Sequence, residues 1–110
     1  MTCKSLRRTH LALLRSRSAA RSGPIAVSWI PLPGCQDRLV AFAISKRVGK
    51  AVVRNKLRRR LREAARLDHD LPAGGYLIRA QPAAAVLPYK ALADHLQRAA
   101  HPASRARGGT

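Results

Sequence analysis

Hydrophobic residues first mark out three short segments of this chain in which almost every position is apolar. Runs of this length are typical of strands in the middle of a sheet, where both faces are covered. They lie at residues 25–30 (IAVSWI), 39–45 (LVAFAIS) and 76–80 (YLIRA). Pro31 and Pro82 stand shortly after the first and the last of them, and they end the strand pattern because proline has no backbone N–H for a sheet ladder.

Elsewhere the apolar residues recur every three or four positions, which predicts amphipathic helices. Such helices are expected at residues 6–16, 51–67 and 89–100. Residues 16–24 (SRSAARSGP) follow neither pattern and are interpreted as a basic turn that closes at Gly23 and Pro24. Residues 101–110 are basic and contain Gly, Pro and Ser, so we expect a single domain over residues 1–100 followed by a disordered tail.

The order of these elements limits how the chain can fold. The helix at 51–67 joins the strands at 39–45 and 76–80, and if these strands are parallel, general rules predict a right-handed crossover. With 110 residues, of which 46% are hydrophobic, the chain can form one modest core. No apolar run approaches the roughly 20 residues of a membrane span, and no signal-peptide pattern is present, so we expect a cytoplasmic protein.

Charge changes this picture most. The chain has 22 Lys and Arg against 5 Asp and Glu, a net charge of +17, and self-repulsion of this size destabilises a folded chain unless a polyanion neutralises it. Residues 45–67 hold ten of these cations and a single acid, Glu63. Arg54, Arg58 and Arg62 recur every four residues and so form one row along the helix, and each guanidinium can hold two phosphate oxygens. We therefore favour a nucleic acid over a membrane surface as the partner.

A search for catalytic side chains finds no set that a reaction catalysed by the protein itself would need. Glu63 is surrounded by arginines, so its pKa is expected to be lowered, which does not suit a general acid. The DHD cluster at 68–70 falls in a predicted helix-to-strand loop and is interpreted as solvated surface, with a metal site as the alternative. Cys3 and Cys35 lack the spacing of zinc ligands and are interpreted as free thiols.

The run Ser45 to Glu63, SKRVGKAVVRNKLRRRLRE, resembles the signature of the bacterial ribonuclease P protein subunit. That family carries a basic pair, then Gly, then Ala-Val, then an Arg-Asn-basic triplet often called the RNR motif. This chain keeps Arg54 and Asn55 and has Lys56 where the family commonly has Arg. Residues 76–84 (YLIRAQPAA) resemble the family's last strand and the proline after it, and the resemblance extends from about residue 6 to 100.

The resemblance implies an α+β fold of order α-β-β-β-α-β-α, a two-layer sandwich like domain 2 of ribosomal protein S5. It implies a left-handed βαβ crossover, against the general rule. It also implies an endonuclease, a hydrolase whose catalytic component is an RNA that holds Mg²⁺ and removes the 5′ leader of precursor tRNA. The protein would bind that RNA and the leader, without a membrane or a stable protein partner. The alternative is a non-catalytic basic nucleic-acid-binding module, such as a ribosomal or architectural protein.

The resemblance, taken residue by residue, also implies two binding sets. The residues expected to contact RNA belong to the basic segment and are Lys46, Arg47, Lys50, Arg54, Asn55, Lys56, Arg58, Arg59, Arg62 and Arg66. The leader is expected between the first helix and the sheet, at Leu11, Leu14, Arg15, Ser28 and Trp29. The family usually has aromatic residues on its first helix, and the leucines here offer apolar contact without stacking.

Side chains alternate along a strand, so Ser28 and Trp29 are expected to face opposite ways, and a core position is favoured for Trp29. Asn55 is weighed equally between an RNA contact and a hydrogen bond within the protein. The residues expected to pack the basic helix on the sheet are Val52, Val53, Leu57 and Leu61.

Overall fold

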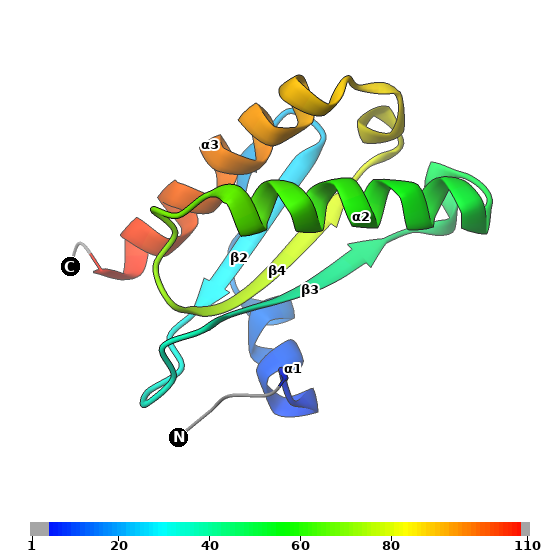
Figure 1. The fold of residues 1–110 in the computed structure, drawn as a ribbon. Helices are drawn as coiled ribbons and strands as arrows, with labels where there is room; N and C mark the ends of the chain where they lie inside the picture. Colours follow the sequence, from blue (N-terminus) through cyan, green and yellow to red (C-terminus); the bar gives the residue numbers. More distant parts are fainter. Residues whose placement is uncertain (1–4, 109–110) are drawn as a thin grey trace.

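The computed structural model describes residues 5–108 and contains a four-stranded sheet with helices on both of its faces (Figure 1). The described chain forms, in order, α1 (Arg8–Ser16), β1 (Ala20–Ser22), β2 (Ile25–Ile30), β3 (Arg38–Ile44), η1 (Lys46–Val48), α2 (Ala51–Leu67), β4 (Gly74–Ala80), η2 (Pro82–Val86) and α3 (Tyr89–Gly108). The three apolar segments form β2, β3 and β4, and the order α-β-β-β-α-β-α is the one that the family resemblance implied.

The strand order is β1-β2-β4-β3, so β4 lies inside the sheet and β3 lies at its edge. β4 runs antiparallel to β2 and parallel to β3, with Ile78 beside Val27 on one side and beside Phe42 on the other. This position explains the burial pattern. All residues of β4 except Arg79 are buried, whereas every residue of β3 is only half-buried.

The chain passes from β3 through α2 to its parallel neighbour β4, and this crossover is left-handed (Figure 1). The hand that the family resemblance implied is therefore confirmed. The right-handed crossover expected from general rules is wrong for this chain.

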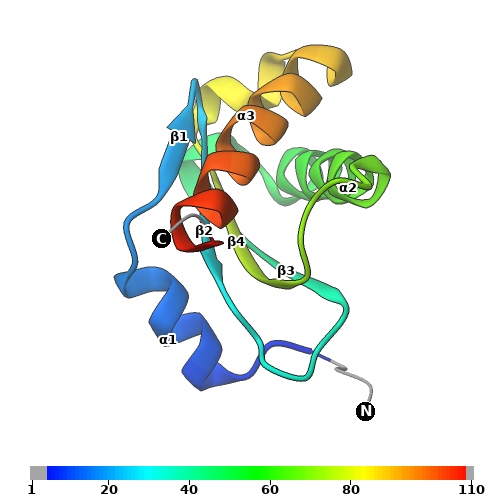
Figure 2. The same ribbon diagram turned by 90° about the vertical axis from the view of Figure 1, so that its left-hand side faces the viewer.

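Alternation along the strands creates two separate apolar layers. Figure 2 shows α1 on one side of the sheet and α2 and α3 on the other. Beneath α2 and α3 the core includes Ile25, Val27 and Ile78, against which Val40 and Phe42 pack. Beneath α1 a smaller cluster joins Leu14, Ile30 and Leu77. The odd and even positions of each strand thus serve different helices.

Two segments differ from the sequence prediction. The basic turn expected at 16–24 contains β1, which pairs with β2 through a two-residue turn in which Gly23 has a φ of 56°. The helix α3 continues through Pro102 to Gly108, into the segment that the sequence predicted as a disordered tail. Ala103 is buried beside Ala99 and Ala100, so the apolar side of the helix extends past the proline.

Two smaller findings complete the fold. The expectation of free thiols is wrong for Cys35, which forms a disulfide bond, because cysteine pairing cannot be deduced from spacing alone. Cys3 lies outside the described residues. Between residues 5 and 108, no helix has the length and apolar character needed to cross a bilayer.

Candidate nucleic-acid interface

The basic segment begins with a tight backbone bend at Gly49. Its φ of 146° lies in the left-handed region that favours glycine, and a Cβ there would lie 3.3 Å from the side chain of Val53. The bend separates η1 from α2, so Lys46 and Arg47 precede the helix while Lys50 occupies its N-cap. Lys50 makes no side-chain capping bond, so the first backbone N–H groups of α2 and the positive end of its dipole add to the charge of these cations.

One side of α2 anchors the helix and leaves its cations at the surface. Leu57 and Leu61 are fully buried, and Ala64 and Ala65 continue their row. Eight of the ten residues expected to contact RNA are exposed, namely Lys46, Arg47, Lys50, Asn55, Lys56, Arg59, Arg62 and Arg66. Arg54 and Arg58 are half-buried. The helix therefore presents fixed positive charge on a rigid support.

The valines at the start of α2 do not pack as expected. Val52 is 78% exposed and Val53 is 38% exposed, so the prediction that they pack the helix on the sheet is wrong. The first turn of α2 projects beyond the buried part of the helix, whose apolar contacts begin at Leu57. Two apolar side chains thus lie among the cations of the motif.

Within the motif, Asn55 interacts with a neighbouring arginine. Nη1 of Arg58 donates a hydrogen bond to Oδ1 of Asn55 over 2.8 Å. The bond joins successive turns of α2 and fixes the direction of the Arg58 guanidinium. One turn earlier, Nε of Arg54 is buried and makes no hydrogen bond within the described chain.

Arg60 and Arg38 serve the fold instead. Nη2 of Arg60 donates to the carbonyl oxygen of Leu87 over 2.6 Å and so fastens the residue after η2 to α2. Arg38 donates to the carbonyl oxygens at the C-terminal end of α2, those of Ala65, Arg66 and Asp68. A cation at this end of a helix also interacts favourably with its dipole.

Glu63 is the acid within this basic surface. Arg66 donates hydrogen bonds to both of its carboxylate oxygens, over 2.6 and 3.2 Å. These bonds and the positive charge of Arg66 lower the pKa of Glu63, as expected from the sequence, and the carboxylate in turn raises the pKa of Arg66. An ionised, paired carboxylate of this kind has no proton to give as a general acid.

The DHD cluster is explained by its surroundings. Oδ2 of Asp68 lies 2.9 Å from Nε2 of His101 on α3, while His69 and Asp70 are exposed. Within residues 5–108 no group of three His, Cys, Asp or Glu side chains is placed to hold a metal ion. Asp68 therefore ties the loop after α2 to the last helix.

Only some of the residues predicted to bind the leader lie at accessible positions. Leu11 is half-buried and Arg15 is exposed on α1, so both are accessible. Leu14 is fully buried against Ile30 and Leu77, which corrects its assignment to the surface, because it faces the sheet rather than the solvent. Ser28 shares a register position with Leu77 on β4, but it is only 1% exposed, and its hydroxyl makes no hydrogen bond within the described chain.

The assignment of Trp29 to the leader-binding residues is also corrected. It packs against the core on the α2 and α3 side of the sheet, and its Nε1 donates to the carbonyl oxygen of Ala73 over 3.3 Å. It therefore does not line the surface between α1 and the sheet, which agrees with the core position favoured for Trp29 and with the opposite orientation expected of Ser28.

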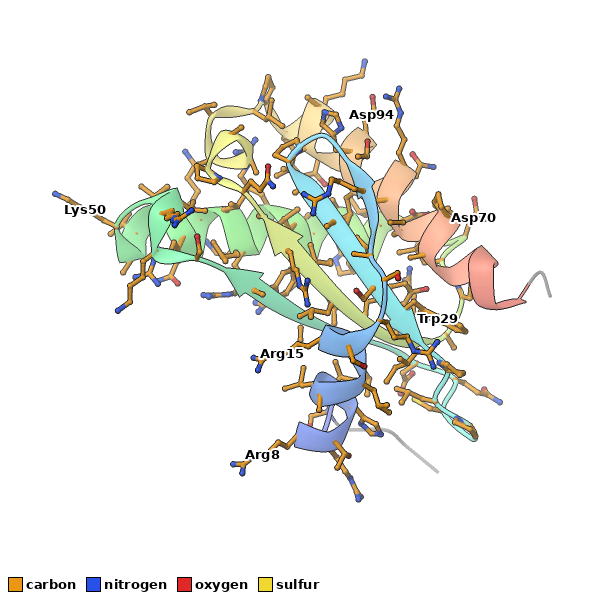
Figure 3. The ribbon with its side chains drawn as sticks, turned by 180° about the vertical axis from the view of Figure 1, so that it is seen from behind. Arg8, Arg15, Trp29, Lys50, Asp70 and Asp94 are labelled. Carbon is orange, nitrogen blue, oxygen red and sulfur yellow. The ribbon has the colours of Figure 1, made fainter. Side chains whose placement is uncertain are left out.

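Two residues on the α1 side were missed by the sequence prediction. Leu13 is 50% exposed on α1, and Nη2 of Arg79 on β4 donates to the carbonyl oxygen of Arg15 over 3.4 Å. Arg79 could have been noticed as the one cation within an apolar strand. In Figure 3, Arg8 and Arg15 extend from α1 toward the side of the molecule on which Lys50 projects from the start of α2.

Comparisons with known proteins point in one direction. A family model described as Ribonuclease P matches residues 5–104. A ribonuclease P protein component from Thermobifida fusca is 40% identical over 105 residues, which cover 88% of this chain and 71% of that protein. The component from Thermus brockianus is 43% identical over 86 residues, covering 78% of this chain and 51% of that protein. The chain thus spans about half the length of this second relative.

Solved structures resemble the fold. The RNase P protein from Thermotoga maritima matches with a TM-score of 0.73 at 19% identity, covering 86% of this chain and 93% of the other. A Staphylococcus aureus RNase P protein mutant with defective mRNA degradation activity matches with a TM-score of 0.78 at 18% identity, covering 94% and 87%. The family model, the 40% identity to the T. fusca protein and the shared fold agree with the motif at Arg54 and Asn55, and this chain belongs to the ribonuclease P protein family.

Proposed function

We propose that this chain is the protein subunit of ribonucleoprotein ribonuclease P, which binds the catalytic RNA and promotes endonucleolytic removal of the 5′ leader from precursor tRNA. The observation that carries the proposal is the start of α2. There the motif cations lie exposed around an uncapped helix N-terminus, and Leu57 and Leu61 fix the helix to the sheet. Family membership supports the same role.

The exposed cations of α2 bind the phosphates of the catalytic RNA. Lys and Arg displace counterions from the RNA backbone, which gives affinity that is strong at low salt and falls steeply as salt increases. Arg54 and Arg58 lie half-buried within this surface, and Asn55 directs the guanidinium of Arg58. They fix how the RNA sits on the helix, while exposed Lys56 and Arg59 add attraction that depends less on geometry.

The leader passes over the α1 side of the sheet. The accessible groups there are Leu11 and Leu13 for apolar contact and Arg15 and Arg79 for phosphate. Aromatic side chains stack on single-stranded bases and contribute about 1–3 kcal/mol for each base, and leucine lacks that π-face. We therefore propose that this subunit holds the leader more weakly than relatives with aromatic residues on α1, and relies more on arginine.

The chemical step belongs to the RNA in this proposal. Phosphate oxygens are the hard ligands that Mg²⁺ prefers, and the RNA-bound ions supply an activated water and charge neutralisation for hydrolysis of the phosphodiester bond. The protein binds the leader and the catalytic RNA together and so orients the scissile bond. Its ionised, arginine-paired Glu63 takes no part in proton transfer.

Competitive binding tests the proposal against a general basic nucleic-acid-binding module. Labelled precursor tRNA is bound to the chain at moderate salt and competed with unlabelled precursor tRNA, with mature tRNA and with duplex DNA of equal phosphate content. We expect precursor tRNA to compete better than mature tRNA, since only the precursor has a leader, and duplex DNA to compete least. Equal competition by all three would favour the general binding module.

A further inference from the structure

An apolar cavity of about 300 Å³ lies on the side of the sheet away from α1, between α2, α3 and the exposed edge of the sheet. Its walls include Val40 and Phe42 of β3, Ile78 of β4, and Leu96 and Ala100 of α3. We call it the α2–α3 cavity. A pocket of this volume with mainly apolar and aromatic walls is typical of sites that take small ligands.

The cavity is open because α2 does not cover the edge of the sheet completely. Phe42 remains half-buried, although most residues of the neighbouring strand β4 are fully buried. The guanidinium carbon of Arg62 lies 5.7 Å from the centre of the Phe42 ring, within the range of a cation–π contact. The opening of the cavity thus combines an aromatic ring with a cation.

The cations at this opening differ in whether they already have a carbonyl or carboxylate partner. Arg38 donates to the carbonyl oxygens that end α2, and Arg66 is paired with Glu63. Arg62 is exposed and forms no ion pair within the described chain. A ligand that fits these surroundings has a planar apolar body for the cavity and a negative charge next to it for Arg62.

We propose that the α2–α3 cavity takes the base of one unpaired nucleotide of bound RNA, with the adjoining phosphate on Arg62. This rests on the proposed RNA-binding function. Unpaired bases in RNA are recognised by stacking on aromatic and guanidinium planes, which the opening supplies. Arg62 also continues the row of Arg54 and Arg58, about 12 Å along the helix from Arg54, so an RNA strand that follows this row reaches the cavity.

The test uses NMR of the full chain, with a single-stranded RNA trinucleotide, UAU, as the probe. We expect the methyl signals of Val40, Ile78 and Leu96 to shift in a saturable way, because an inserted ring alters its immediate surroundings. Inorganic phosphate should leave these methyl signals in place. Adenosine monophosphate should shift them at higher concentration, which would show that one nucleotide suffices.

Two variants and a control decide the outcome. Ala100→Leu fills the cavity and should abolish the methyl shifts while the trinucleotide still binds elsewhere on the basic surface. Arg62→Gln should weaken binding at least about threefold more than Arg59→Gln, which removes the same charge from an exposed position outside the cavity. If Ala100→Leu does not fold, the two arginine variants decide alone.

Unchanged cavity methyl signals in the wild-type chain, with shifts confined to the start of α2, would overturn the proposal and leave the proposed function intact. Equal effects of Arg62→Gln and Arg59→Gln would also overturn it. Failure of the wild-type chain to bind any RNA would overturn both the inference and the proposed function.

Discussion

The hydrogen bond from Nη1 of Arg58 to Oδ1 of Asn55, 2.8 Å long, joins the asparagine of the RNR motif to an arginine one turn further along α2. It gives Asn55 a role that its lack of charge does not suggest. The side chain orients a cation that would otherwise sample many rotamers. An arginine held in advance loses less entropy when it binds phosphate.

Asn55→Ala should therefore weaken binding of ribonuclease P RNA without affecting the fold. We expect a loss of about 3- to 10-fold, equivalent to about 1 kcal/mol, the usual contribution of one hydrogen bond. Filter binding at constant salt measures the affinity, and thermal unfolding controls for stability. In an Arg58→Ala background the same substitution should have little further effect. An equally large loss in that background would argue that Asn55 contacts the RNA itself.

The double variant Arg54→Ala with Arg58→Ala should reduce the salt dependence of RNA binding. Each phosphate of single-stranded RNA that the protein no longer neutralises lowers the slope of log affinity against log salt by about 0.7, so the pair should lower it by about 1.4. Arg21→Ala serves as the control, because exposed Arg21 lies on β1, at the opposite edge of the sheet from β3. A slope equal to that of the wild-type chain would show that Arg54 and Arg58 do not face RNA.

Burial along α2 predicts different outcomes for an introduced aspartate at two positions of the helix. Leu57 is 1% exposed and Val52 is 78% exposed. Leu57→Asp places a carboxylate in the core and should lower the free energy of unfolding by at least about 3 kcal/mol, or prevent folding. Val52→Asp should change it by no more than about 0.5 kcal/mol. Urea unfolding followed by circular dichroism measures both, and similar losses would show that α2 is placed wrongly on the sheet.

Gly49→Ala should destabilise the bend that precedes α2. A non-glycine residue in this region of φ costs about 1–3 kcal/mol, and the added Cβ would also crowd Val53. Val53→Ala in the same background removes the two γ-methyl groups, but Cβ of residue 53 stays 3.3 Å from the added Cβ and the backbone strain remains, so it should recover only part of the loss. A Gly49→Ala protein as stable as the wild type would contradict the left-handed conformation. Thermal unfolding of the wild type, of Gly49→Ala and of the double variant compares these contributions.

These outcomes follow from features that the sequence revealed to different degrees. Long periodic segments predicted α2 and α3, and continuous apolar runs predicted β2, β3 and β4. In each case the residues that are buried against another element are apolar, so the spacing of apolar residues follows the geometry of the helix or strand. β1 escaped notice because its three residues, Ala20–Ser22, are too few and too polar to alternate. The end of α3 was not predicted because the Gly, Pro and Ser residues around Pro102 indicated a tail, whereas the burial of Ala103 cannot be read from the sequence.

The candidate site was predicted least well at residues whose exposure decides whether they can contact RNA. Leu14 and Leu13 are adjacent, yet one is fully buried and the other is half-exposed, and the helical period alone does not fix which faces the sheet. Arg54 and Asn55 were identified by their order, and the left-handed crossover followed from the resemblance that this order supports, because general packing rules predict the other hand. Arg79 and the α2–α3 cavity depend on elements far apart in the chain, which no local pattern joins.

The most direct test of the account measures cleavage of precursor tRNA by a bacterial ribonuclease P RNA, at a Mg²⁺ concentration at which the RNA alone is nearly inactive. We predict that adding this chain restores cleavage at the mature 5′ end, that the chain without the RNA cleaves nothing, and that the Arg54→Ala, Arg58→Ala variant requires a higher protein concentration for the same rate. Cleavage by the chain alone, or an unchanged rate when the wild-type chain is added, would contradict the account.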